Sequence, residues 1–210
     1  RLGRSTPVVM VKGGRTEAGE RAAGSHTAAL AGSDAAVDAF FRQTGIIRAR
    51  SLAEMFDLGR FLSTQPLPPG RRVGIVTNAG GPGILCADAL ERSGLAVPTL
   101  SDEVQHALGG ILPEEAATGN PVDMVASAGP DEYRETVELL LGSGELDALV
   151  VIYTPVGLVD TDDVSRAVVE GWRSAADGGA EGVPFFFFND TATTEIYTLE
   201  GDGGSIPAYP

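Results

Sequence analysis

Short apolar runs alternate with helix-like stretches along this chain, and that alternation is its strongest constraint on the fold. Runs rich in Val, Ile, Leu and Phe predict strands at residues 7–12, 73–77, 147–153 and 183–188, with shorter ones at 46–47 and 95–97. Stretches with cap residues and a helical apolar period predict helices at 34–44, 52–62, 84–93, 130–141 and 160–176, and one starting at Ser101. Strands joined through helices pair in parallel, so the sequence predicts an α/β fold with doubly wound parallel sheets.

A proline-rich segment divides the chain. Ser63–Gly70 contains three prolines, which cannot continue a helix and favour an extended spacer. We therefore expect a first domain at residues 1–62, a linker at 63–71 and a second domain at 72–188. The chain begins without an initiator Met, and its first residues resemble the end of a helix. We expect a part of a longer protein, with both domains incomplete.

Charge and cysteine content exclude several classes of partner. The formal net charge is −14, which argues against nucleic acid or an anionic membrane surface. Any phosphate site must be built from backbone donors and a few basic side chains. Cys86 is the lone cysteine, no signal peptide is evident, and no apolar run reaches transmembrane length. These features predict a cytoplasmic protein.

One histidine lies among small residues before a helix start. His26 is flanked by Ser25 and Thr27, and the segment runs on to Ser33 and Asp34. Small neighbours leave room for an anion, and a helix N-terminus attracts one. A neutral imidazole can carry a phosphoryl group, while Lys12, Arg15 and Arg21 lie nearby in sequence. The alternative is a histidine that is simply hydrogen-bonded in a loop.

Two further segments follow predicted strands in the second domain. The turn Asn78–Gly83 joins a strand to a helix, where open α/β sheets bind ligands; it offers the backbone of Asn78, Gly80, Gly81 and Gly83 to an anion. It lacks the Gly-Lys-Ser/Thr ending of a Walker A loop, and a turn without a ligand fits it equally. Asn120 and Asp123 either stabilise their own turn or support a binding site. In the second case, Asp123 would orient a loop or bind a cation through a water molecule. No metal-ligand motif is present.

Taken together, these motifs resemble the ADP-forming acyl-CoA synthetases, relatives of succinyl-CoA synthetase. The segments Val11–Gly19 and Ser25–Asp34 resemble that family's phosphohistidine region, and Val76–Gly83 followed by Gly119–Asp123 resembles its next domain. Order and spacing agree over most of residues 7–184. The resemblance implies two flavodoxin-like domains of the succinyl-CoA synthetase type. One departure is Ala28, where the family usually has glycine.

The resemblance implies a phosphoryl relay in which an acid, CoA and ATP give acyl-CoA, ADP and phosphate, reversibly. His26 would be the carrier, with Ser25, Thr27 and the Asn78–Gly83 turn binding the phosphoryl group. CoA, ATP or ADP and Mg²⁺ would be bound mainly by a CoA-binding domain and an ATP-grasp domain outside this chain, either fused to it or on another subunit. The substrate would be a small carboxylic acid or its acyl phosphate, and we expect an oligomer. Residues 1–210 alone are expected to be inactive.

The C-terminal region departs from this pattern. Residues 189–198 resemble the conceptual translation of a widely used DNA-sequencing adapter, and residues 203–210 again resemble the family. We expect an artefactual, poorly packed segment at 189–202 within the native sequence.

Two other functions are compatible with the same architecture. Related chains fused to an acetyltransferase domain act as regulatory modules that sense a small ligand, often with the histidine replaced. An inert flavodoxin-like domain that only assembles subunits is the third possibility. The presence of His26 favours catalysis.

Overall fold

A computed structural model of the chain describes residues 6–14, 16, 18, 19, 21, 34–157 and 159–189. The chain forms two compact units, Arg1–Thr64 and Gln65–Pro210. The division between them falls within the proline-rich segment predicted to be a linker.

The described residues of the first unit include two short parallel strands and two helices of more than ten residues. Strand β1 (Val9–Val11) pairs with β2 (Ile47–Ala49), and Met10 lies opposite Arg48. Helix α2 (Asp34–Thr44) connects them and ends at Gly45, whose φ of +77° suits glycine. Helix α3 (Leu52–Thr64) begins after Ser51, whose Oγ accepts a hydrogen bond from the Glu54 N–H. The predicted strands and helix starts are confirmed here.

Part of the predicted loop at residues 15–24 is helical. Ala18, Gly19 and Arg21 have helical backbone. The cause is local, because the Thr16 Oγ1 accepts a hydrogen bond from the Gly19 N–H at 3.1 Å, as an N-cap residue does.

Several large apolar side chains of α2 and α3 are exposed. Phe40, Leu52 and Phe56 are 56%, 60% and 68% exposed, and Phe41 is the buried residue of α2. The helical apolar pattern of residues 34–44 and 52–62 predicts that these three side chains point inward, and the structure shows that this prediction is wrong. The two strands described in this unit have three residues each, so they offer these helices little sheet to pack against.

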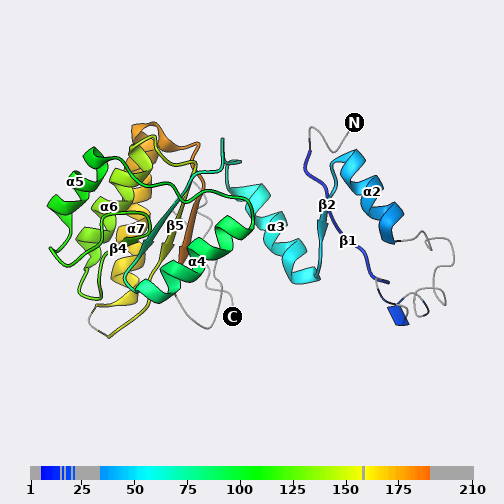
Figure 1. The fold of residues 1–210 in the computed structure, drawn as a ribbon, viewed down its shortest axis with the longest axis horizontal. Coiled ribbons are helices and arrows are strands. Elements are labelled where there is room, and N and C mark those ends of the chain that lie inside the picture. Colours follow the sequence, from blue (N-terminus) through cyan, green and yellow to red (C-terminus); the bar gives the residue numbers. More distant parts are fainter. Residues whose placement is uncertain are drawn as a thin grey trace. The chain divides into compact units, whose positions relative to one another are not determined.

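The second unit is built on a four-stranded parallel sheet with strand order β4-β3-β5-β6 (Figure 1). The strands are β3 (Val73–Thr77), β4 (Val122–Asp123), β5 (Ala148–Ile152) and β6 (Phe185–Phe188). This is the strand order of flavodoxin-like sheets, with its reversal between β3 and β5. The predicted α/β class with parallel sheets is confirmed.

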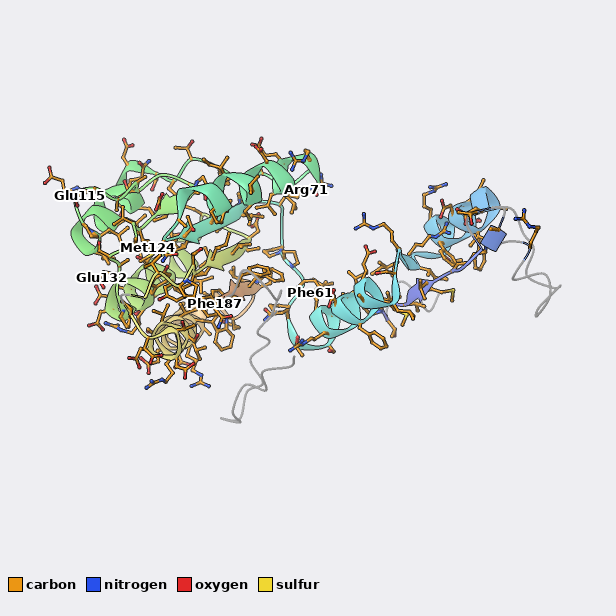
Figure 2. The ribbon with its side chains drawn as sticks, turned by 90° about the horizontal axis from the view of Figure 1, so that it is seen from below. Phe61, Arg71, Glu115, Met124, Glu132 and Phe187 are labelled. Atoms are coloured by element: carbon orange, nitrogen blue, oxygen red, sulfur yellow. The ribbon has the colours of Figure 1, made fainter. Side chains whose placement is uncertain are left out.

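Helices cover both faces of this sheet. Helix α4 (Gly80–Arg92) packs on one face, and helices α5 (Asp102–Ile111), α6 (Pro130–Gly142) and α7 (Thr161–Ala175) pack on the other. Alternate residues of β5 point to opposite faces, so Leu149 joins the larger core while Val150 faces α4. Met124 and Phe187 lie inside this unit, and Glu115 lies at its surface (Figure 2).

Three details differ from the sequence prediction. The strand predicted at residues 95–97 is a single parallel bridge between Arg72 and Ala96. Helix α4 begins at Gly80, four residues before the predicted start, so the glycines of the predicted turn form its first turn. After Ala175, α7 continues into a short π-helical turn at Ala176–Ala180, which contains Gly179 at a φ of +106°.

Most of the segment predicted to be artefactual, residues 190–202, lies outside the described residues, as does 203–210. Asn189 is described, and its Nδ2 donates to the Ser165 Oγ at 3.5 Å. None of the helices in the described part of the chain is long and apolar enough to span a membrane.

Candidate functional site

The predicted phosphoryl carrier and its neighbours, Ser25, His26 and Thr27, lie outside the described residues. Two residues of opposite charge, one before and one after that segment in the chain, lie close together. Lys12 directly follows β1, and Asp34 is the first residue of α2. Their Nζ and Oδ1 atoms are 3.8 Å apart.

Arg48 of β2 joins this pair of charges. Its Nη2 donates to the Asp34 Oδ1 at 2.5 Å, and its Nη1 donates to the Asp38 Oδ1. Hydrogen bonds to these two carboxylates raise the pKa of the guanidinium above its ordinary value. Sequence reasoning missed this residue, although an arginine between Ile47 and Ala49 is an unusual member of an apolar strand.

The predicted phosphate-binding turn lies at the carboxyl end of β3. Helix α4 begins at Gly80, and no side chain caps the helix at Ala79. The Gly83 N–H donates to the Ala79 carbonyl over a long distance of 3.4 Å. Pro82 has no N–H, so Gly80 and Gly81 supply the N–H groups of the first turn. An anion placed there would also meet the positive end of the helix dipole.

The glycines of this turn meet different surroundings. A Cβ at Gly83 would lie 2.9 Å from the Thr77 Cγ2, and one at Gly80 would lie 3.0 Å from the Asp123 Oδ2. A Cβ at Gly81 would meet nothing within 4 Å. Gly83 therefore lets the helix approach the strand closely, while the space beside Gly81 is open.

Asn78 connects the ends of the two central strands. Its side chain is buried; its Oδ1 accepts from the Thr154 N–H at 2.8 Å, and its Nδ2 donates to the Thr154 carbonyl at 2.9 Å. Thr154 follows β5, so this pairing bridges the point where the strand order reverses. The amide is engaged with protein backbone. Thr154 was not predicted from the sequence, since its role depends on a partner 76 positions away.

Asn120 and Asp123 lie at the two ends of the β4 segment. The Asn120 Oδ1 accepts from the Ile75 N–H at 2.9 Å, and its Nδ2 donates to the carbonyls of Val73 and Pro98 at 2.9 and 3.0 Å. The Asp123 Oδ1 accepts from the N–H of Val125 at 3.1 Å, and Val125 has a φ of +60°. A β-branched residue rarely adopts that angle, so strain is stored beside the candidate site.

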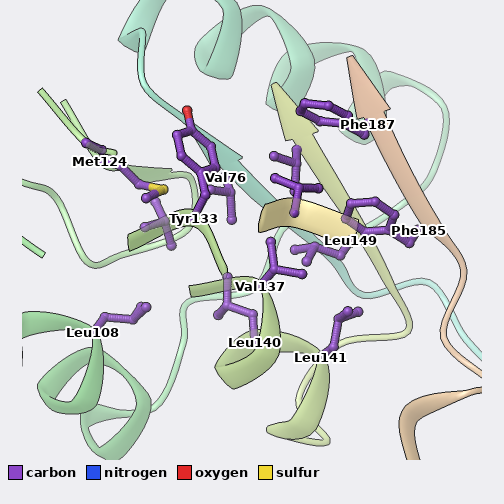
Figure 3. Close-up of a cluster of buried hydrophobic side chains, with 14 of the residues drawn as sticks. Val76, Leu108, Met124, Tyr133, Val137, Leu140, Leu141, Leu149, Phe185 and Phe187 are labelled. Carbon is purple, nitrogen blue, oxygen red and sulfur yellow. The ribbon is translucent and has the colours of Figure 1, made fainter. Parts of the chain in front are cut away.

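A buried tyrosine pair lies beneath the same edge. The rings of Tyr133 and Tyr153 meet edge to face with centroids 5.7 Å apart. The hydroxyl of Tyr133 has no hydrogen-bond partner among the described residues and points away from Leu140 and Leu141 (Figure 3). Burial raises the pKa of Tyr133 well above its ordinary value, and Tyr153 and Asp123 raise it further. This residue also was not predicted from the sequence.

Within the part of the chain that the structure describes, no group of three or more His, Cys, Asp or Glu side chains is arranged to hold a metal ion. The charges nearest the glycine turn are the positive end of the α4 dipole and the Asp123 carboxylate. The helix terminus suits an anion bound by the backbone N–H groups of Gly80 and Gly81, while the Asp123 carboxylate opposes an anion on the Gly80 side.

Comparison with protein families matches two domains. Residues 1–62 match the succinyl-CoA ligase-like flavodoxin domain, and residues 73–176 match the Ligase-CoA domain.

Two similar proteins come from Pyrococcus furiosus. The chain is 42% identical to the alpha subunit of its ADP-forming acetate–CoA ligase II over 97% of this chain and 44% of the relative. It is 31% identical to the alpha subunit of ligase I over 100% of this chain and 44% of the relative. The chain thus spans less than half the length of these relatives.

A solved structure shares the fold. Acetyl-coenzyme A synthetase 1 of Ca. Korarchaeum cryptofilum, in complex with phosphate and ADP, superposes with a TM-score of 0.79 at 31% identity. The match covers 88% of this chain and 39% of that one.

Proposed function

This chain belongs to the ADP-forming acyl-CoA synthetases, relatives of succinyl-CoA synthetase, and we propose that it is part of an acid–thiol ligase of the acetate–CoA type. The reaction joins a small carboxylic acid to CoA while ATP becomes ADP and phosphate, and it is reversible. Among the described residues, the feature that best supports the proposal is the first turn of α4, which no side chain caps. Its N–H groups at Gly80 and Gly81 lie at the carboxyl end of β3.

We infer that His26 carries the phosphoryl group. In the direction that uses ATP, an imidazole nitrogen attacks the γ-phosphorus, a P–N bond forms, and the P–O bond to ADP breaks. A carboxylate oxygen of the acid then takes the phosphoryl group and the P–N bond breaks, which frees the histidine. Attack by the CoA thiolate on the acyl carbonyl finally releases phosphate. Each transfer depends on position and charge stabilisation more than on protein covalent chemistry.

The remaining predicted residues bind or position. The Ser25 and Thr27 hydroxyls would donate to the phosphoryl oxygens on His26. In the second unit, the N–H groups of Gly80 and Gly81 would bind a phosphate group. Gly83 allows α4 to approach β3 closely enough for that contact. Asn78, Asn120 and Asp123 hold the neighbouring loops through bonds to backbone groups.

The ATP- and CoA-binding parts would lie outside residues 1–210, on the same polypeptide or on a second subunit. The Pyrococcus relatives support this assignment, because each is an alpha subunit more than twice as long as the matched region. Mg²⁺ would accompany the nucleotide, and we assign no ion to the described residues. The low cysteine content fits a reducing compartment, and we place the enzyme in the cytoplasm.

The test is phosphorylation of the complete enzyme with γ-labelled ATP and Mg²⁺. We expect label that is stable in base and labile in acid, as a phosphohistidine is. The variant His26→Ala should lose it. The chain's other histidine provides a matched control: His106 is exposed on α5, and His106→Ala should keep the label. A folded, intact enzyme that takes up no label would contradict the proposal.

A further inference from the structure

Arg48 places its guanidinium against two carboxylates of one helix. Asp34 and Asp38 are one turn apart on α2, and each accepts a hydrogen bond from a different terminal nitrogen of Arg48. The planar guanidinium suits such a double contact, which a lysine ammonium cannot reproduce with the same geometry.

The surroundings strengthen this contact. The side chain of Arg48 is 12% exposed, and those of Asp34 and Asp38 are 31% and 35% exposed. Lys12 contributes a second cation 3.8 Å from Asp34 and is 21% exposed. Partial shelter from water makes these ion pairs stronger than pairs on an open surface. We call Lys12, Asp34, Asp38 and Arg48 the charge cluster.

The charge cluster gathers three elements at one place. Lys12 directly follows β1, Arg48 lies within β2, and Asp34 begins α2. Along the chain, Lys12 and Asp34 lie on either side of the histidine segment, and Asp34 is eight residues beyond His26. The cluster therefore joins the end of β1, which precedes that segment in the chain, to the helix start that follows it.

The first half of α2 buries little side-chain surface. Phe41, in the second half of the helix, is its buried residue, while Ala35 and Ala36 in the first half are exposed. The bonds from Arg48 to Asp34 and Asp38 help to hold the N-terminal half in place. Losing these bonds would free the end of α2 that is joined to the histidine segment.

We propose that Arg48 is a positioning residue for phosphoryl transfer at His26, acting through Asp34 and Asp38. The proposal rests on the function proposed above. A phosphoryl relay is sensitive to such positioning, because a displacement of about 1 Å can cost on the order of 100-fold in rate.

The experiment measures single-turnover phosphorylation of His26 in the complete enzyme at saturating labelled ATP. Arg48→Met keeps the length of the side chain and removes its donors, and we expect a rate about 10- to 100-fold lower. The KM for ATP should stay within about twofold of the wild-type value, because the nucleotide is bound elsewhere. Arg48→Lys should recover part of the rate, since it restores the charge but not the double contact.

Arg42 gives a matched control. It is an exposed arginine in the last turn of the same helix, and Arg42→Met should label at the wild-type rate. If Arg48→Met does not fold, Asp34→Asn tests the same idea, because it removes the carboxylate shared by Lys12 and Arg48.

The outcomes separate the two proposals. A wild-type enzyme without label contradicts the phosphohistidine function itself. A labelled wild type with equally fast Arg48→Met or Asp34→Asn overturns the positioning role. The role is also overturned if the variants lose label only in proportion to their unfolded fraction, measured by circular dichroism at the assay temperature.

Discussion

The side chain of Asn120 extends the sheet of the second unit where strand β4 is too short to do so. Its Oδ1 accepts from the Ile75 N–H and its Nδ2 donates to the Val73 carbonyl, both at 2.9 Å. These groups flank Gly74, and a residue of a neighbouring parallel strand would bond the same two groups with its own C=O and N–H. The amide thus substitutes for one residue of β4, which pairs with β3 at Val76 and Thr77.

Replacing Asn120 with alanine should therefore cost the protein much of its stability. Three hydrogen bonds are lost, including the third to the Pro98 carbonyl at 3.0 Å. Ile75 is fully buried, so its N–H would be left without water or partner. At about 1 kcal/mol per bond, and more for the stranded donor, we expect a loss of about 3 kcal/mol in the free energy of unfolding.

Urea unfolding followed by the fluorescence of Trp172 measures this loss. Trp172 is the chain's single tryptophan and packs against the core of the same unit. With a slope of about 1–3 kcal/mol per molar urea, the midpoint should fall by about 1–3 M. Gln105→Ala is the control. The Gln105 amide donates to the Leu100 carbonyl, and losing that single bond should lower the free energy of unfolding by about 1 kcal/mol.

Asn120→Asp refines the test. At neutral pH the carboxylate still accepts from the Ile75 N–H but faces the carbonyls of Val73 and Pro98, so the variant should be at least as unstable as Asn120→Ala. Protonation restores a donor, and the deficit relative to the parent should narrow in acid. An Asn120→Ala midpoint equal to that of the parent at unchanged slope would refute the strand-substitution argument.

Two further predictions concern stability. Gly83→Ala should lower the free energy of unfolding by about 1–3 kcal/mol through overpacking, while Gly81→Ala, which meets open space, should be neutral or gain up to about 1 kcal/mol; urea unfolding of both variants checks this. The bonds from Arg72 hold the pKa of the Asp147 carboxyl below its ordinary 3.8, so its contribution is present at neutral pH and is lost as pH falls below that value. In urea unfolding across this pH range, Asp147→Asn should therefore lose less of its free energy of unfolding than the parent does as pH falls.

Much of the fold could be predicted because its signals are local. The apolar run Val73–Thr77 became a fully buried strand, as a strand covered on both faces must be. Ser101 and Asp160 cap their helices with side-chain oxygens, as their positions before helical stretches indicated. These features depend on residues within one helical turn or one strand.

The parts that escaped prediction depend on distant partners. Arg48 meets Asp34 across 14 positions, and Asn78 meets Thr154 across 76. Nothing in the periodicity of either segment encodes such a contact. Likewise, the exposure of Leu52 and Phe56 depends on how much sheet the unit presents to α3, which a helical apolar pattern cannot reveal.

The same contacts indicate where a phosphoryl group can bind in the second unit. Parallel sheets usually bind ligands where the strand order reverses, here between β3 and β5, but the pairing of Asn78 with Thr154 bridges that point. On the β4 side, the Asp123 carboxylate lies beside Gly80 and would repel an anion. The space at Gly81 is open and lies within the first turn of α4, where the helix dipole is positive. We therefore expect the phosphoryl group to approach α4 from the Gly81 side, outside the crevice that the topology alone would indicate.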